Sequence, residues 1–304
     1  MAAVFTAAAC EHHPGHPEQP ARITAVWRRL REDGRFTPIE AAPAELDYLT
    51  LRHPREFVLG VEARAFRGEP AGEETPLSRA SWPAVLGAAG AVSAAVRHAM
   101  AHGAAFAAVR PPGHHASADR AMGFCPVNLV TCAVAQARLA GAERALIVDW
   151  DVHHGNGTQD IVAREDATRF VSMHQHPWYP GTGMASERGV GNCFNVPLPP
   201  GLSRAQYVAE LWAAIEAAGD GWMPDAIFVS AGYDAMAGDP LGGFTLEPED
   251  YATLVARLRD RWPDAPLVGV MEGGYAPERL ADGVLATVAA MGGATRKGRG
   301  AKGG

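Results

Sequence analysis

Short, continuous apolar runs alternate with longer amphipathic stretches along most of the chain. Apolar runs of about four to eight residues bounded by turn formers are typical of buried strands, whereas longer periodic stretches are typical of helices. We expect strands at residues 105–109, 145–149, 168–173, 226–230 and 266–271, after a first strand near the N-terminus. We expect helices at residues 82–101, 127–139, 203–218, 248–261 and 277–290. This alternation predicts an α/β fold in which helices cover both faces of a central, mostly parallel sheet.

The chain has 304 residues, and no linker or shift in composition divides its middle. A single α/β domain of this length is ordinary, so we expect one domain over residues 1–295. Residues 296–304 (RKGRGAKGG) form a basic, glycine-rich tail that we expect to be disordered.

Composition narrows the classes of protein to consider. Hydrophobic residues make up 47% of the chain and charged residues 20%, which is typical of a globular protein. The net charge of −7, from 27 basic and 34 acidic residues, argues against a nucleic-acid binder held by phosphate contacts. No apolar run approaches the roughly 18 residues of a membrane span, so we expect no membrane partner. The four cysteines form no CxxC pair, which indicates free thiols and a reducing cytoplasm: Cys10, Cys125, Cys132 and Cys193.

The most informative polar residues follow the apolar run ALIV that precedes Asp149. Side chains alternate in an extended backbone, so Asp149, Asp151 and His153 share one face. Two carboxylates and one imidazole pack poorly in a core, but their oxygen and nitrogen atoms suit a divalent metal such as zinc. Ligands of parallel α/β sheets bind beyond the carboxyl ends of the strands, which is where these residues are predicted to lie.

Other strand ends carry further candidate residues. Asp239 lies in a Gly/Pro-rich loop and is a candidate carboxylate ligand, although an Asp before Pro is more often a turn former. His114 and His115 follow the stiff segment RPPG, which suits catalytic imidazoles held within reach of a proton. Tyr275 follows two glycines and can turn its hydroxyl towards a pocket, although a single Tyr is more often a packing residue.

Seven short segments, in their order along the chain, resemble the motifs of the zinc-dependent histone deacetylase superfamily. This superfamily includes class II histone deacetylases and bacterial acetylpolyamine amidohydrolases. The segments are RPPGHHA (110–116), MGFCP (122–126), VDWDVHHGNGT (148–158), YPGTG (179–183), SAGYDA (230–235), DPLG (239–242) and EGGY (272–275). The N-terminal HPEQPAR (16–22) is similar to the opening segment of the family. The resemblance covers the chain apart from its tail, and it implies a single-domain arginase/deacetylase-like fold.

The resemblance also implies a ligand set and a proton-transfer pair. Zinc would be held by Asp151, His153 and Asp239, which leaves room for water and substrate. His115 would be the general base, and His114 an electrostatic or general-acid partner. A structural potassium site is expected near Asp149, Asp151, His153 and Ser172.

Positioning roles follow from the same resemblance. Asp149 would accept a hydrogen bond from His114 and raise its basicity. Asn156 stands where class II enzymes commonly have Asn, behind the second histidine of the pair. Tyr275 would donate its hydroxyl to the amide carbonyl and then to the oxyanion. Arg22 would face an internal route for acetate release.

Four residues are expected to bind the substrate. Phe124 and Tyr179 would flank the tunnel for the alkyl chain of an acylated amine, and Gly123 would contribute a backbone carbonyl. Polyamine-selective members carry an acidic residue just after the Asp-Pro, whereas this chain has Leu241. The segment at residues 69–81 is short, which leaves little room for a long dimerisation loop.

We therefore predict a zinc-dependent deacetylase that hydrolyses an N-acetylated amine, an acetyl-lysine side chain above all, to a free amine and acetate. Three alternatives stay open: an acetylpolyamine or other small-amine amidohydrolase, a catalytically inactive acyl-lysine-binding protein, and a ureohydrolase on the related arginase-like fold. The last is disfavoured because its DxHxD cluster is not matched by the order Asp149, Asp151, His153. The sequence leaves the oligomeric state open, and it assigns no chemistry to His12 and His13.

Overall fold

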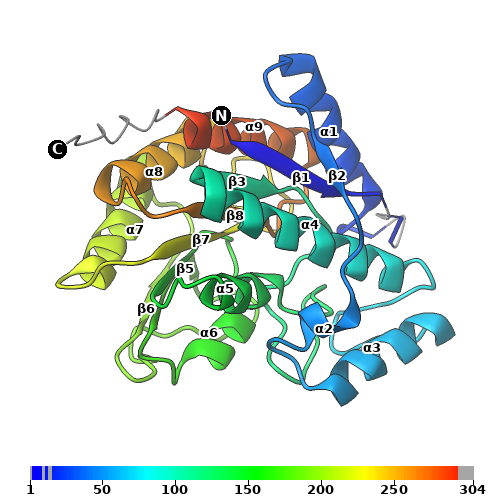
Figure 1. Cartoon of the computed structure of the whole chain (residues 1–304). Helices are drawn as coiled ribbons and strands as arrows, with labels where there is room; N and C mark the ends of the chain where they lie inside the picture. The colour runs from blue at the N-terminus through cyan, green and yellow to red at the C-terminus, as the bar shows by residue number, and fades with distance from the viewer. Residues whose placement is uncertain (1, 9–10, 13–15, 294–304) are drawn as a thin grey trace, which may run out of the picture.

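Eight parallel strands form one sheet in the computed structural model, which describes residues 2–8, 11–12 and 16–293 (Figure 1). The sheet order is β2-β1-β3-β8-β7-β4-β5-β6. The strands are β1 (Ala3–Ala7), β2 (Ile39–Ala41), β3 (Ala104–Ala107), β4 (Ala145–Asp149), β5 (Thr168–Gln175), β6 (Cys193–Leu198), β7 (Ala226–Ala231) and β8 (Leu267–Met271). The helices are α1 (Pro20–Asp33), α2 (Leu46–Leu49), α3 (Arg55–Arg67), α4 (Ser81–His102), α5 (Leu129–Leu139), α6 (Asn156–Val162), α7 (Arg204–Gly219), α8 (Pro248–Arg261) and α9 (Pro277–Gly292).

Two apolar layers cover the two faces of the sheet. Helices α1, α7, α8 and α9 pack on one face, and α3, α4 and α5 pack on the other. The alternation of strand side chains separates the layers: on β4, Leu146 and Val148 belong to the first layer, whereas Ala145 and Ile147 belong to the second. The expected sheet with helices on both faces is therefore confirmed, and all of its strand pairings are parallel.

The two strands missed by the sequence pattern lie at the sheet edges, and the helices it missed are α1, α2, α3 and α6. Strands β2 and β6 are the two edge strands; β2 has no buried residue, and β6 has two, Cys193 and Asn195. Edge strands need no continuous apolar run, and β6 even contains Pro197. Helix α5 begins two residues later than predicted, because Asn128 caps it by accepting from the Thr131 N–H.

Helix α4 modifies the sequence expectation about membrane spans. It has the length and mean hydropathy of a spanning helix, and it is the one described helix that does. In the fold, 67% of its most apolar window is buried against the sheet and neighbouring helices. The helix therefore packs as a core element of this domain.

Four adjacent strands bring the predicted chemistry to one edge of the sheet. β3, β8, β7 and β4 are neighbours in the sheet and run in parallel, so the loops that follow them meet. These loops carry His114, His115, Asp151, His153, Asp234, Asp239 and Tyr275. The tail at residues 296–304, together with Cys10 and His13, lies outside the described residues.

Candidate active site

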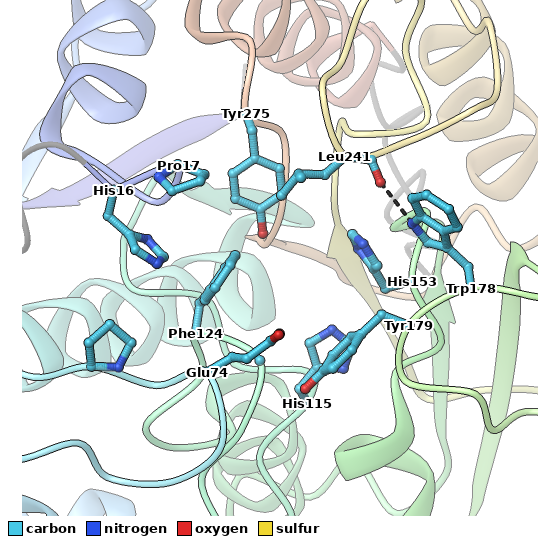
Figure 2. Close-up of a pocket in the computed structure, with 12 residues that line it drawn as sticks. His16, Pro17, Glu74, His115, Phe124, His153, Trp178, Tyr179, Leu241 and Tyr275 are labelled. Atoms are coloured by element: carbon cyan, nitrogen blue, oxygen red, sulfur yellow. Dashed lines mark hydrogen bonds between the residues drawn. The ribbon is translucent and has the colours of Figure 1, made fainter.

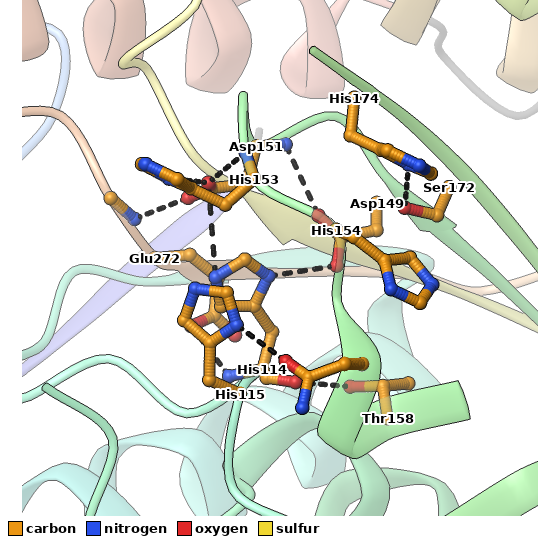
Figure 3. Close-up of polar contacts among 12 residues, drawn as sticks. His114, His115, Asp149, Asp151, His153, His154, Thr158, Ser172, His174 and Glu272 are labelled. Carbon is orange, nitrogen blue, oxygen red and sulfur yellow. Dashed lines mark hydrogen bonds and ion pairs between the residues drawn. The ribbon is translucent and has the colours of Figure 1, made fainter. Parts of the chain in front are cut away.

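The loop after β4 folds back so that its alternate side chains converge (Figure 3). Asp149, Asp151 and His153 are all buried, and Asp151 Oδ1 accepts a hydrogen bond from the His153 backbone N–H at 2.9 Å. The same carboxylate oxygen lies 2.9 Å from Nδ1 of the His153 ring. Residues 151–153 form a bend and not an extended strand, so this local turn brings the carboxylate and the imidazole together.

Three buried side chains offer ligand atoms that lie within 4.8 Å of one another: Asp151, His153 and Asp234. Asp234 Oδ2 lies 3.2 Å from His153 Nδ1 and accepts no hydrogen bond from the described residues. An orphaned carboxylate oxygen facing an imidazole and a second carboxylate is a donor set that fits zinc. Burial, together with the charges of Asp151 and Asp239, raises the pKa of Asp234 to about 7, against the opposing effect of His153.

Asp239, the third ligand expected from the sequence, is not a member of that group. Its carboxylate accepts backbone hydrogen bonds from Leu241 at 2.9 Å, from Tyr275 at 2.6 Å and from Ala276 at 3.3 Å. These bonds place it beside two residues that line the substrate pocket. Sequence reasoning assigned no role to Asp234, although its position directly after β7 was a usable signal.

The tandem histidines lie beside this cluster, with ring centroids 4.1 Å apart. His114 Nδ1 lies 3.0 Å from Asp149 Oδ2, and His115 Nδ1 lies 2.7 Å from Asn156 Oδ1. The structure therefore brings together the two imidazole–partner pairs that the resemblance implied. Nδ1 of His115 donates to the amide oxygen, because an amide oxygen can only accept, which leaves Nε2 as an acceptor.

The two histidines have opposite electrostatic environments. Burial lowers the pKa of His114, but the carboxylates of Asp151 and Asp149 outweigh it, so its pKa is raised well above the usual value. Burial, together with the nearby His114 and His153, holds the pKa of His115 well below its usual value. Two titratable groups whose environments separate their pKa values are the typical arrangement of an acid and a base.

A pocket of about 540 Å³ opens onto these residues (Figure 2). All four residues predicted to bind substrate line it: Gly123, Phe124, Tyr179 and Leu241. Tyr275 lines it as well, and its hydroxyl points into the pocket between Phe124 and His153. The rings of Phe124 and Tyr275 meet edge to face at 5.8 Å. The pocket therefore joins aromatic walls to the buried polar cluster.

The pocket is also lined by residues without a predicted site role: His16, Pro17, Glu74, Pro76 and Trp178. Trp178 donates from its indole N–H to the Leu241 carbonyl at 2.9 Å and forms part of the rim. Glu74 is exposed at the rim, and its carboxylate is the only acid among the described lining residues. Its backbone has a φ of +48°, and its carbonyl accepts from the Phe124 N–H at 3.1 Å. The segment at residues 69–81 is short, as expected, yet it reaches the pocket.

Two glycines are required where backbone and site meet. A Cβ on Gly273 would lie 2.1 Å from Asp234 Oδ2 and 2.5 Å from Asp151 Oδ2. Gly123 has a φ of +56°, and a Cβ there would lie 2.5 Å from the His115 ring. Any side chain at either position would displace a polar residue of the site.

A family model described as the histone deacetylase domain matches residues 16–291. The chain belongs to the histone deacetylase family. It is 36% identical over 299 residues to a protein of Archaeoglobus fulgidus named "Probable deacetylase", covering 93% of this chain and 83% of that protein. It is 34% identical over 275 residues to a histone deacetylase-like amidohydrolase of Pseudomonas aeruginosa, covering 86% and 72%. A crystal structure described as the HDA15 HD domain is similar with a TM-score of 0.90 and 32% identity, covering 95% of this chain and 88% of that chain.

Membership in the histone deacetylase family confirms the predicted superfamily and the arginase/deacetylase-like fold class. It also identifies the protein as a hydrolase that acts on amides. The family implies an acetylated substrate for the pocket described above.

Arg22 of this deacetylase-family protein is fully buried in an ionic cluster near Tyr275. Its Nη1 donates to Glu18 Oε1 at 3.0 Å, and its Nε donates to the Gly274 carbonyl at 2.6 Å. Arg110 completes the cluster by donating to Glu18 Oε2 at 2.6 Å. The Arg22 guanidinium also lies 5.1 Å from the centroid of the Tyr275 ring, so Arg22 fixes the loop that carries this tyrosine.

Two further histidines, His12 and His154, have structural partners. His12 Nδ1 lies 2.5 Å from Ser81 Oγ. His154 lies 2.8 Å from Thr182 Oγ1 and 3.1 Å from Gln159 Oε1, and burial lowers its pKa to about 4. A buried, neutral imidazole with both nitrogens engaged is a packing residue with satisfied polar atoms.

Proposed function

We propose that the protein is a zinc-dependent deacetylase that hydrolyses the amide of an acetyl-lysine side chain to a free amine and acetate. One observation carries this proposal: two buried imidazoles with oppositely shifted pKa values lie beside a carboxylate–imidazole cluster that opens onto an aromatic-walled pocket. An amide needs both a proton acceptor for the attacking water and a donor for the developing charge. We assign the domain to residues 1–295.

We propose Asp151, His153 and Asp239 as the ligands of one zinc ion. When bound, zinc polarises the amide carbonyl and lowers the pKa of water to about 7. Asp239 is supported by its position beside Tyr275 and Leu241 at the pocket, since a catalytic metal must stay accessible to substrate. In this assignment Asp234 is not a ligand. It holds the loop that carries Asp151 and His153, because its Oδ1 accepts a hydrogen bond from the Val152 N–H at 2.8 Å.

The ligand assignment is tested by zinc content after dialysis, measured by mass spectrometry and independent of activity. We expect Asp239→Asn to lose zinc and Asp234→Asn to retain it. The reverse result would replace Asp239 by Asp234 in the ligand set. A structural potassium ion near Asp149, Asp151, His153 and Ser172 is part of the same proposal, supported by the register that pairs Asp149 with Ser172.

The side chains of this chain supply the proton transfers. His115 takes the proton of the attacking water at Nε2, because its Nδ1 donates to Asn156, and it passes this proton to the amine nitrogen as the C–N bond breaks. Tyr275 donates its hydroxyl to the carbonyl oxygen, where negative charge develops. His114, kept protonated by Asp149 and Asp151, places a positive charge beside the reacting amide.

The walls of the pocket favour an extended alkyl chain. Phe124 and Tyr179 line the pocket, and Trp178 extends its apolar surface to the rim. In this proposal the backbone carbonyl of Gly123 accepts a hydrogen bond from the amide N–H of the substrate. Leu241 lines the pocket beside Trp178. An acetylated lysine side chain has the length and polarity that such a pocket takes.

A second candidate substrate class is the acetylated polyamines, and Glu74 is the observation that favours it. Its carboxylate at the rim is positioned to meet a distal ammonium group. Turnover of an acetyl-lysine peptide compared with that of an N-acetylated diamine separates the two classes. We expect the peptide to be the better substrate, because the residue after Asp239-Pro240 is Leu241 and not an acid.

The reaction is tested by acetate release from an acetyl-lysine peptide by the zinc-loaded enzyme. We expect turnover that chelation abolishes and added zinc restores. Full activity of His115→Ala or Tyr275→Phe, or activity untouched by thorough chelation, would refute the mechanism. Binding of the peptide by the zinc form without turnover would identify an inactive acyl-lysine-binding protein.

We also propose a cytoplasmic location. It is supported by three buried free thiols among the described residues, Cys125, Cys132 and Cys193, which suit a reducing compartment.

A further inference from the structure

Glu272 is a fully buried acid that the mechanism above does not use. It directly follows β8 and opens the segment EGGY that ends in Tyr275. Its Oε1 has no hydrogen-bond partner among the described residues, and no arginine or lysine pairs with its carboxylate there. A buried acid without a paired arginine or lysine costs stability, so a purely structural role would be served better by an apolar side chain.

The other oxygen of Glu272 holds the loop of the tandem histidines (Figure 3). Oε2 accepts from the Gly113 N–H at 2.6 Å and from the His114 N–H at 3.1 Å. These are the two backbone donors immediately before His115. The loop follows β3, and its His114 carbonyl accepts from the Thr158 N–H at 3.0 Å; the Glu272 carboxylate adds a connection to the end of β8.

Two further hydrogen bonds fix the backbone around Glu272. Its carbonyl accepts from the buried guanidinium of Arg22, and the next residue, Gly273, donates its N–H to Asp151 Oδ2 at 2.8 Å. The strand end that leads to Tyr275 is thereby tied to the ligand loop. Glu272 is thus the point at which the histidine loop and the tyrosine loop are connected.

We propose that Glu272 is a positioning residue that sets the placement of the proposed base His115 relative to the proposed donor Tyr275. The inference rests on the proposed deacetylase function. Glu272 acts through the two hydrogen bonds that its Oε2 accepts. These bonds fix the backbone from which the imidazoles of His114 and His115 project. A misplacement of about 1 Å between reacting groups can cost roughly 10²-fold in rate.

Two variants separate hydrogen bonding from packing. Glu272→Gln keeps an acceptor oxygen of the same length, whereas Glu272→Leu fills a similar volume and accepts no hydrogen bond. Glu165→Gln is the matched control, since Glu165 pairs with Arg52 and Arg138 away from the pocket. The measurements are kcat and KM on an acetyl-lysine peptide, zinc content, and amide hydrogen exchange of Gly113 and His114.

We expect Glu272→Leu to lose about 100-fold in kcat with KM within about twofold and zinc content unchanged. Glu272→Gln is expected to recover kcat to within about fivefold of the parent, and the control to match the parent. Equal loss in the Gln and Leu variants, or kcat of the zinc-loaded Leu variant within threefold of the parent, would overturn the proposal.

Hydrogen exchange tests the same contact without any turnover. The Gly113 and His114 amides are expected to exchange slowly in the parent protein and in Glu272→Gln, and to lose protection in Glu272→Leu. Fast exchange of both amides in the parent would overturn the proposal even if the Leu variant did not fold. If the parent hydrolyses no acetylated amine, the proposed function fails, while the exchange result still decides whether Glu272 holds the loop.

Discussion

Replacing Asn156 by Asp would add a negative charge next to the proposed general base. The Asn156 amide oxygen lies 2.7 Å from Nδ1 of His115, and a carboxylate oxygen fits the same place. The new charge stabilises the imidazolium form, so it raises the pKa of His115, which burial holds well below its usual value in the parent.

The magnitude follows from the geometry. Charge centres about 4 Å apart interact by roughly 4 kcal/mol at an effective dielectric constant of about 20, which corresponds to about three pKa units. Asn156 is half-buried and borders a second, polar cavity of about 550 Å³. Solvent screening there reduces the effect, so we expect a rise of about one to two units.

The assay is the pH dependence of kcat/KM on an acetyl-lysine peptide, which reports the ionisation of the free enzyme. A base acts in its neutral form, so a raised pKa of His115 moves the acidic limb of the profile to higher pH. An acidic limb that stays in place, or moves to lower pH, would refute the assignment of His115 as the base.

Gln159→Glu is the matched control for this prediction. It adds a carboxylate to the same cavity, 3.1 Å from His154, a histidine without a proposed proton transfer. We expect its acidic limb to coincide with that of the parent. A shift as large as that of Asn156→Asp would show that the charge acts on the whole site and not through His115.

Three other changes test separate parts of the account. Tyr275→Phe is expected to lower kcat by about 10²–10³-fold at unchanged zinc content, and a KM effect alone would contradict its role as the oxyanion donor. Glu74→Gln is expected to raise KM for an acetylated diamine by about two- to fivefold and to leave KM for an acetyl-lysine peptide with neutral flanking residues unchanged. Asn128→Ala removes a buried helix cap that also donates to the Ala116 carbonyl and Thr158 Oγ1, so urea unfolding should show a loss of about 2–4 kcal/mol. The exposed cap variant Ser203→Ala should lose only about 1 kcal/mol in the same measurement.

The sequence predicted the part of the site that lies at one strand end. Asp149 ends β4, and Asp151 and His153 follow within four residues, so their placement at one strand end was predictable, although residues 151–153 form a bend and not extended backbone. The central strands were also predictable, because burial on both faces makes their apolar runs continuous. The half-exposed edge strands β2 and β6 lack this signal.

The parts that depend on long-range contacts were not predictable. Glu74 reaches the pocket because its segment hydrogen-bonds to Gly123 and Phe124, about fifty residues later in the chain. Whether Asp234 or Asp239 lies next to Asp151 and His153 depends on the path of the loop after β7. No periodicity in the sequence encodes that path. The opposite pKa shifts of His114 and His115 arise from burial and from acids on other strands, which only the folded chain brings together.

The bond from Arg22 to the Gly274 carbonyl has a consequence for the order in which the protein matures during synthesis. These two residues are 252 positions apart, so the ribosome needs about 13 to 50 s between them at roughly 5–20 residues per second. Within that interval the tandem histidines and the β4 loop are made, and the tyrosine loop that Arg22 anchors is made only at its end. The nascent chain therefore stays inactive until its last strand and α9 emerge, and hydrolysis begins only once the whole domain has been made.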